Sequence, residues 1–131
     1  MAAGTVGIRR IGQIAITVRD QERARDFYRD VLGIQHLFDA PPKMSFFDCA
    51  GVRLLLGEAE PGAEEHGASI LYLDVADIQA AHEMLESRAV AFVAAPHKVA
   101  DLGDRDLWLA FFRDSEGNVM ALMSEVMKAS G

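Results

Sequence analysis

The chain repeats one pattern twice, and this repeat constrains the fold more than any other feature of the sequence. A run of strand character followed by a helical run occupies residues 11–33 and returns at residues 69–90. Three pairs of identical residues lie 57 positions apart: Val18 with Val75, Asp20 with Asp77, and Ala24 with Ala81. A period this long with two copies indicates a duplicated module rather than a solenoid.

The segments that follow each helix also correspond. "FFDCAGVRLLL" (46–56) parallels "FFRDSEGNVMAL" (111–122), with one residue inserted before the glycine, so the offset becomes 66. Each copy therefore reads as strand, helix and three strands. We predict one α+β domain over 1–131, with module 1 at about 8–58 and module 2 at about 68–126. The polar, Gly- and Pro-marked stretch at about 59–67 is typical of a linker between them.

Local signals place the two helices. Asp20 and Asp77 are suited to cap helix starts, and Gly33 suits the left-handed position after a helix end. Along the second helix we expect Ala81, Met84 and Leu85 to form the inner face.

Strand alternation separates two faces. We expect Ile14, Ile16 and Val18 to lie under the first helix. The opposite face carries Gln13, Ala15 and Thr17, and in the second copy Ile70, Tyr72 and Asp74. That mixed face suits a ligand-binding concave sheet, and it equally suits a sheet that simply faces solvent.

Composition excludes several classes of partner. A net charge of −7 in 131 residues disfavours binding to a nucleic-acid backbone. No apolar run reaches the roughly 18 residues of a membrane helix, and the start has no hydrophobic stretch of signal-peptide length. Cys49 is the only cysteine, so an internal disulfide is excluded. We expect a cytoplasmic protein without nucleic-acid or membrane partners.

Residues 12–34, "GQIAITVRDQERARDFYRDVLGI", and residues 111–122 resemble the opening and closing signatures of the vicinal oxygen chelate superfamily. This superfamily includes glyoxalase I, extradiol dioxygenases, methylmalonyl-CoA epimerase and the bleomycin resistance proteins. The resemblance implies two βαβββ modules that curl into an open barrel-like cup. It also implies a homodimer, because small members commonly pair modules across chains, and in many members a divalent metal held by four side chains.

The four metal positions of the superfamily can be located one at a time. The first, usually His and sometimes Gln, corresponds to Gln13. The second corresponds to Leu55, the third to Ile70 and the fourth to Ala121. Three of these side chains are hydrocarbons without lone pairs, whereas a catalytic metal needs about three protein ligands. We therefore expect no metal and no cofactor. Gln13 is then either a polar remnant that faces a ligand or a solvated strand end.

Other residues offer weaker candidates for chemistry. The polar segment "APHKVADLGDRDLW" (95–108) reads as a long loop of the kind that closes over sites. His97 in that loop, with Asp101 or Asp104, is a candidate acid–base pair, and Asp74 is a further carboxylate candidate. The alternatives are a solvated loop and a strand-end cap. The remaining histidines, His36, His66 and His82, read as scattered surface residues.

Aromatic and sulfur-containing side chains supply possible walls for a planar ligand. The candidates are Met44, Phe46, Phe47, Tyr72, Trp108 and Met123. Ordinary core packing is the alternative for each of them. Together these features favour a metal-free protein that binds or sequesters a small, mostly apolar organic molecule, as the bleomycin resistance proteins do. The rival is an enzyme (a lyase, isomerase or dioxygenase) with a displaced metal or with acid–base residues such as His97 and Asp74.

Overall fold

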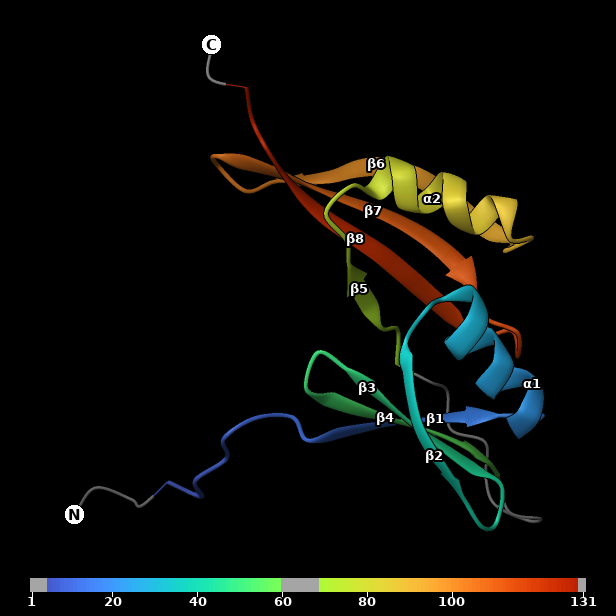
Figure 1. The fold of residues 1–131 in the computed structure, drawn as a ribbon. Helices are drawn as coiled ribbons and strands as arrows, with labels where there is room; N and C mark the ends of the chain where they lie inside the picture. Colours follow the sequence, from blue (N-terminus) through green and yellow to red (C-terminus); the bar gives the residue numbers. More distant parts are fainter. Residues whose placement is uncertain (1–4, 60–68, 130–131) are drawn as a thin grey trace.

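The fold was analysed in a computed structural model, which describes residues 5–59 and 69–129 (Figure 1). The predicted linker beyond residue 59, and His66 within it, lie outside the described residues. The elements of the first module are β1 (Gln13–Val18), α1 (Gln21–Asp26), the π-helical turn η1 (Phe27–Val31), β2 (Gln35–Ala40), β3 (Met44–Cys49) and β4 (Val52–Glu58). Those of the second are β5 (Tyr72–Asp74), α2 (Ile78–Ser87), β6 (Phe92–Asp101), β7 (Arg105–Arg113) and β8 (Val119–Met127).

Each module forms its own four-stranded sheet, with the orders β1-β4-β3-β2 and β5-β8-β7-β6. The pairs β1/β4 and β5/β8 are parallel, and the other neighbours are antiparallel. The predicted α+β fold of two βαβββ modules is therefore confirmed. The two sheets are not closed into a barrel. None of the helices in the described ranges is both long enough and apolar enough to cross a lipid bilayer.

Both predicted helix caps are present. The Asp20 side chain accepts a hydrogen bond from the Arg23 N–H at 3.0 Å, and Asp77 accepts one from the Ala80 N–H at 3.0 Å. Gly33 has a φ of 76°, as expected after a helix end. The inner face of α2 was partly mispredicted, because Met84 is exposed. Leu85 is buried, as predicted, and Ala81 packs against the core; Met84, about 100° away from Leu85 round the helix, lies outside that face.

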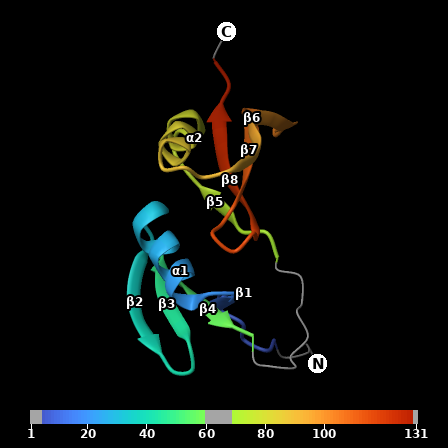
Figure 2. The ribbon, with the colours of Figure 1, turned by 90° about the vertical axis from the view of Figure 1, so that its right-hand side faces the viewer.

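The core lies between the helices and one face of each sheet. Ile16 and Val18 of β1 are buried there, as predicted, and Phe47 of β3 is completely buried. From α1 and η1, Ala24 and Tyr28 fill the space above the sheet with no exposed surface. Helix α1 also lies beside the lower end of β7 and β8 (Figures 1 and 2), and hydrogen bonds from Asp20 and Arg23 to Glu116 join it to the second module.

The turn between β7 and β8 joins the two modules through Glu116. Its carboxylate accepts hydrogen bonds from the N–H groups of Arg19 and Asp20, each at 2.8 Å, and from Arg23 Nε at 2.7 Å. Its side chain is only 1% exposed. Burial by itself would raise the pKa of Glu116, but these hydrogen bonds and one from Ser115 outweigh it and lower that pKa to about 2.

A second contact between the modules lies beside the first. The Tyr28 hydroxyl donates a hydrogen bond to Asp114 Oδ2 at 2.7 Å, and its oxygen lies 3.3 Å from Met120 Sδ. Burial, together with the neighbouring Asp114 carboxylate, raises the pKa of Tyr28, which keeps the hydroxyl protonated as a donor. Asp114 also orders the turn between β7 and β8, because its Oδ1 accepts hydrogen bonds from the N–H groups of Glu116 and Asn118.

Candidate functional site

The face of the first sheet that is turned away from α1 is largely apolar. Along one row of the register, Ala15, Leu55, Phe46 and Phe38 lie on neighbouring strands. The rings of Phe38 and Phe46 are stacked, with centroids 4.7 Å apart. Phe38 is 48% exposed and Phe46 is half-buried, so part of this aromatic pair is open to solvent. Phe46, a predicted wall residue, thus lies beside Leu55, one of the positions that correspond to metal ligands.

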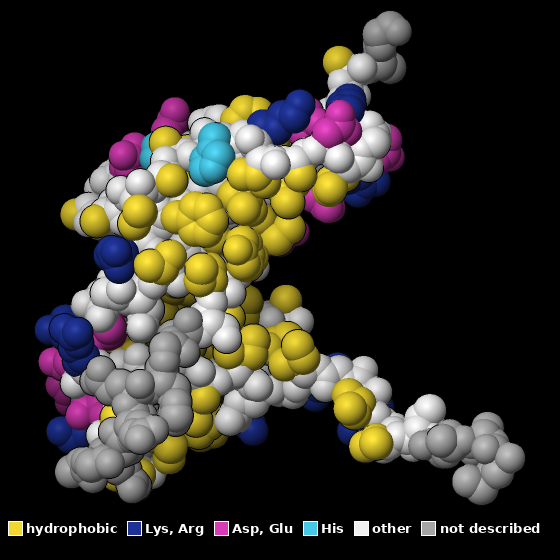
Figure 3. All heavy atoms as spheres, turned by 180° about the vertical axis from the view of Figure 1, so that it is seen from behind, with side chains coloured by type: hydrophobic (Ala, Val, Ile, Leu, Met, Phe, Trp, Pro, Cys, Tyr) yellow, Lys and Arg dark blue, Asp and Glu magenta, His cyan; other side chains and the backbone are white. Residues whose placement is uncertain are grey.

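The second sheet has a comparable open face. Tyr72, Ala121 and Phe111 are neighbours in the register, and the Tyr72 and Phe111 rings meet edge to face at 6.3 Å. Tyr72 is about half exposed, whereas Ala121 between the two rings is completely buried. Met123 belongs to the next row, beside Asp74. Figure 3 shows hydrophobic side chains gathered around a hollow between the two halves of the molecule.

A row of polar residues crosses the first sheet at one end of its apolar face. Gln13, Arg53 and Asp48 are direct neighbours on β1, β4 and β3. Arg53 Nε donates a hydrogen bond to Gln13 Oε1 at 2.8 Å, and Arg53 Cζ lies 5.5 Å from the centre of the Phe46 ring. These three residues line a shallow hollow of about 490 Å³, together with Arg10, Gly12, Leu37 and Gly51.

The four positions that correspond to metal ligands do not provide a donor set. Gln13 is the only one with a lone pair to offer, and its amide oxygen already accepts a hydrogen bond from the Arg53 guanidinium. That positive group would also repel a divalent ion. Leu55, Ile70 and Ala121 are hydrocarbons, and Ala121 is buried. Within residues 5–59 and 69–129, no group of three or more His, Cys, Asp or Glu side chains is placed to hold a metal. The residues do not fit a superfamily metal centre.

Trp108 does not belong to the open face, contrary to the sequence-based expectation. Along β7, Leu107 and Leu109 point to one face of the sheet. Trp108 points to the other face, the one covered by α2, as Ala110 and Phe112 do. There it packs against the core cluster. Phe47 likewise fills the core rather than a pocket wall.

The predicted loop at 95–108 is also wrong, because most of this segment is the β6–β7 hairpin. His97 lies within β6, where its Nδ1 is 2.7 Å from the Ala95 carbonyl. Asp101 is paired with Lys128 at 2.6 Å and Asp104 with Arg105 at 3.1 Å, so neither forms the proposed pair with His97.

His97 is also far from the other candidate acid–base group, Asp74. The two residues lie in one row of the second sheet, but Leu109 and Met123 stand between them. Three strand spacings separate them, about 14 Å. Their side chains therefore do not converge on one reacting group.

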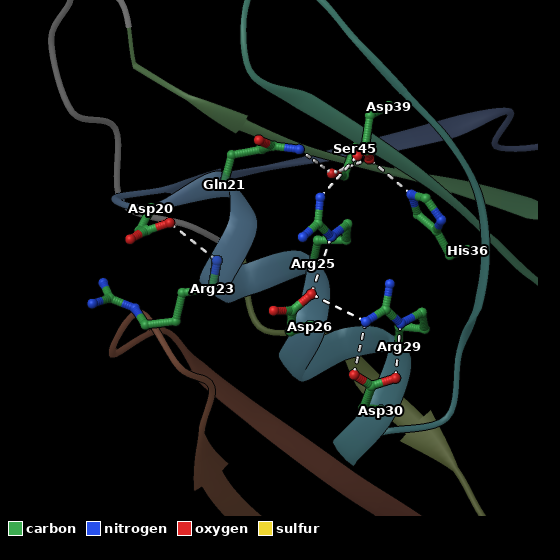
Figure 4. A network of polar contacts seen from close by, with 10 residues as sticks. All are labelled: Asp20, Gln21, Arg23, Arg25, Asp26, Arg29, Asp30, His36, Asp39 and Ser45. Atoms are coloured by element: carbon green, nitrogen blue, oxygen red, sulfur yellow. Dashed lines mark hydrogen bonds and ion pairs between the residues drawn. The ribbon is translucent and has the colours of Figure 1, made fainter.

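Between α1 and the first sheet lies a polar network that the sequence had not indicated (Figure 4). Asp39 Oδ1 accepts a hydrogen bond from Ser45 Oγ at 2.6 Å and lies 2.8 Å from His36 Nε2, while Arg25 donates to Oδ2 at 3.0 Å. Gln21 in turn donates to Ser45. Burial would raise the pKa of Asp39, but the hydrogen bonds from Ser45, His36 and Arg25 lower it to about 2.

This network is structural rather than nucleophilic. The Asp39 carboxylate contacts both Ser45 and His36, so His36 has no position from which to take the serine proton. Ser45 is completely buried and out of reach of a substrate. His36, as part of this network, is not a scattered surface residue. Neither is His82, which packs edge to face on Phe92 at 4.4 Å and has a side chain only 14% exposed.

Three open-face residues were missed from the sequence: Phe38, Arg53 and Phe111. Of the three, Arg53 could have been predicted most easily from the sequence. It stands two residues before Leu55 on the same strand and therefore on the same face. Phe38 is placed by a bulge between His36 and Phe38 in the pairing of β2 with β3. A bulge shifts the alternation and cannot be located from side-chain pattern alone.

Comparison with known proteins places this geometry in context. Residues 10–122 match the model of the Glyoxalase/Bleomycin resistance protein/Dioxygenase superfamily. The uncharacterized protein YetH of Bacillus subtilis (strain 168) is 29% identical over 125 residues, which cover 88% of this chain and 98% of YetH.

Two solved structures are similar over nearly their whole length. A superfamily member from Sphaerobacter thermophilus DSM 20745 has a TM-score of 0.76 and 28% identity, covering 90% of this chain and 98% of its own. TnmS3, described as an antibiotic binding protein from Streptomyces sp. CB03234, has a TM-score of 0.73 and 27% identity, covering 92% and 99%.

Proposed function

Because this chain belongs to the Glyoxalase/Bleomycin resistance protein/Dioxygenase superfamily, we propose that it binds a small, mostly apolar organic molecule on its open sheet faces, without a metal. The observation that carries the proposal is the pair of apolar open faces. Each carries an aromatic pair with one ring about half exposed, Phe38 or Tyr72. The metal-ligand positions of the superfamily correspond there to Leu55, Ile70 and Ala121. The likeness to TnmS3, an antibiotic binding protein, supports a binding role. A role in antibiotic resistance and a cytoplasmic location remain parts of this proposal.

A binding role is favoured over catalysis by the placement of the polar groups. His97 and Asp74, the candidate acid–base residues, lie about 14 Å apart by strand spacing. Flat aromatic surfaces such as the stacked Phe38 and Phe46 bind planar molecules through area burial and ring contacts. Leu55 and Phe46 of the first sheet, and Tyr72 and Met123 of the second, are therefore proposed ligand-contacting residues, with Gln13 and Ile70 at the margin.

Replacing Phe46 by alanine is expected to weaken binding of a planar aromatic probe, 2-naphthamide, by about 1–3 kcal/mol, because one wall of the face is lost. Isothermal titration calorimetry measures this difference. Met84→Ala is the matched control, since Met84 is exposed on α2, away from the open faces. The proposal would be contradicted by 2-naphthamide failing to bind, or by equal affinities for wild type and Phe46→Ala.

We also propose a homodimer. Val6, Ile8 and Ile11, in the segment before β1, are 92%, 85% and 65% exposed, and so many large apolar side chains together suit an interface. The two sheets also leave unclosed edges, which favour pairing with another chain.

Sedimentation velocity at micromolar concentration is expected to show a species of twice the 14.3 kDa chain mass. Replacing Val6, Ile8 and Ile11 together by serine should shift the distribution toward the monomer, because the apolar contact area is lost. Met84→Ser, a similar change on α2, should leave it unaltered. A wild-type protein that sediments only as a monomer would rule out the dimer.

A further inference from the structure

We propose that Arg53 anchors an anionic group of the ligand, so that the open face of the first sheet selects planar aromatic acids over their neutral analogues. This inference rests on the proposed function and narrows its ligand class. Arg53 stands on β4 in the polar row with Gln13 and Asp48. The next row on the same face is the apolar one formed by Ala15, Leu55, Phe46 and Phe38.

The spacing of these two rows matches the dimensions of such a ligand. Residues two apart on a strand are about 7 Å apart and point to the same face. The Arg53 guanidinium lies over the Phe46 ring. An aromatic body lying along this apolar row, over Leu55 and against the edge of Phe46, would therefore place a carboxylate attached to its ring next to that guanidinium. The stacked ring of Phe38 extends the apolar surface on the other side.

Among the described residues, one edge of the Arg53 guanidinium is held by a hydrogen bond, and the other edge is free to bind a ligand. Its Nε donates to Gln13 Oε1 at 2.8 Å, and its Cζ lies 5.5 Å from the centre of the Phe46 ring. In the described part of the chain, neither Nη atom has a hydrogen-bond partner or an ion pair. A planar fork that is already oriented loses less conformational freedom when it binds a carboxylate.

The charges around the hollow favour an anion. Arg10 lines the same hollow, with Nη1 donating to the Gly51 carbonyl at 3.0 Å. Asp48 is the one acidic side chain among the lining residues, and it forms no ion pair with Arg53 within 4.0 Å. Two guanidinium groups against one carboxylate leave the hollow with a positive balance, although the whole protein carries a net charge of −7.

The test compares two probes that differ only in charge, 2-naphthoate and 2-naphthamide, by calorimetry at low salt. Wild type is expected to bind 2-naphthoate about tenfold more tightly, the factor expected of one charge-assisted hydrogen bond. Arg53→Gln should abolish this preference and keep 2-naphthamide affinity within about threefold. Arg53→Lys should show an intermediate preference, because it keeps the charge without the fork. Arg19→Gln, an exposed arginine outside the hollow, should behave as wild type.

The outcomes separate this inference from the function on which it rests. Equal binding of both probes by wild type, or a preference that survives in Arg53→Gln, would overturn the role of Arg53 and leave the binding function standing. Failure of both probes to bind would overturn both. Thermal unfolding of each variant checks that it is folded at the temperature of the titration.

Discussion

Replacing Phe47 by alanine is expected to lower the free energy of unfolding by about 4 kcal/mol, the middle of the range for a fully buried phenylalanine. Phe47 has no exposed surface. Its ring packs against the Tyr28 ring, with centroids 6.0 Å apart, and against the His36 ring at 5.2 Å. Removing it leaves a cavity between the first sheet and the helix above it, which rigid neighbours fill only in part. Urea unfolding followed by circular dichroism measures the loss.

The adjacent residue is a matched control for this prediction. Phe46 precedes Phe47 on β3 but points to the open face, where its truncation leaves no closed cavity. Phe46→Ala should therefore change stability far less than Phe47→Ala and should instead weaken binding of the aromatic probe. Equal losses of stability in the two variants would mean that the two faces of β3 are assigned wrongly.

Replacing Glu116 by alanine is expected to lower the free energy of unfolding by about 3 kcal/mol, because a buried carboxylate with several donors is removed. The N–H groups of Arg19 and Asp20 would lose their acceptor at the start of α1. Arg23 is half exposed and can return to water, which limits the cost. Glu83→Ala, at an exposed position on α2, should change stability by less than about 0.5 kcal/mol.

The pH dependence gives a second and independent readout for Glu116. Its pKa is lowered in the folded state from 4.5 to about 2. A lowered folded-state pKa stabilises the protein above pH 4.5, and this stabilisation is lost as the pH falls from about 4.5 toward 2. The difference between wild type and Glu116→Ala should therefore shrink over that range. A constant difference from pH 7 to pH 2.5 would show that the carboxylate charge does not join the modules.

Local chemistry explains why much of the fold could be predicted. Helix starts follow from Asp20 and Asp77, whose side chains bond to N–H groups three residues away. Sheet faces follow from alternation, which placed Ile16 and Val18 in the core and Gln13 on the open face. These features depend on neighbours within one turn or one strand, so they are visible in the sequence.

The errors occurred where local signals are ambiguous. The polar residues of 95–101 suggested a loop, yet this segment is an edge strand, and an edge strand tolerates polar side chains because one side faces solvent. The prediction that Trp108 lines the pocket rests on residue type alone, and Trp108 packs against the core cluster. A large aromatic side chain serves equally well in a core and in a ligand wall, so residue type did not decide between them.

By itself, the sequence determined the duplicated βαβββ architecture and the helix caps, because each is a property of residue identity and spacing. It also showed hydrocarbon side chains at Leu55, Ile70 and Ala121, three positions that the resemblance to the superfamily assigns to metal ligands. Only the tertiary structure decided which distant groups meet. It paired Gln13 with Arg53, 40 residues away, and Glu116 with Arg23, 93 residues away. Such contacts depend on strand register and on how the two modules pack, and these result from the burial of the whole core rather than from any one segment.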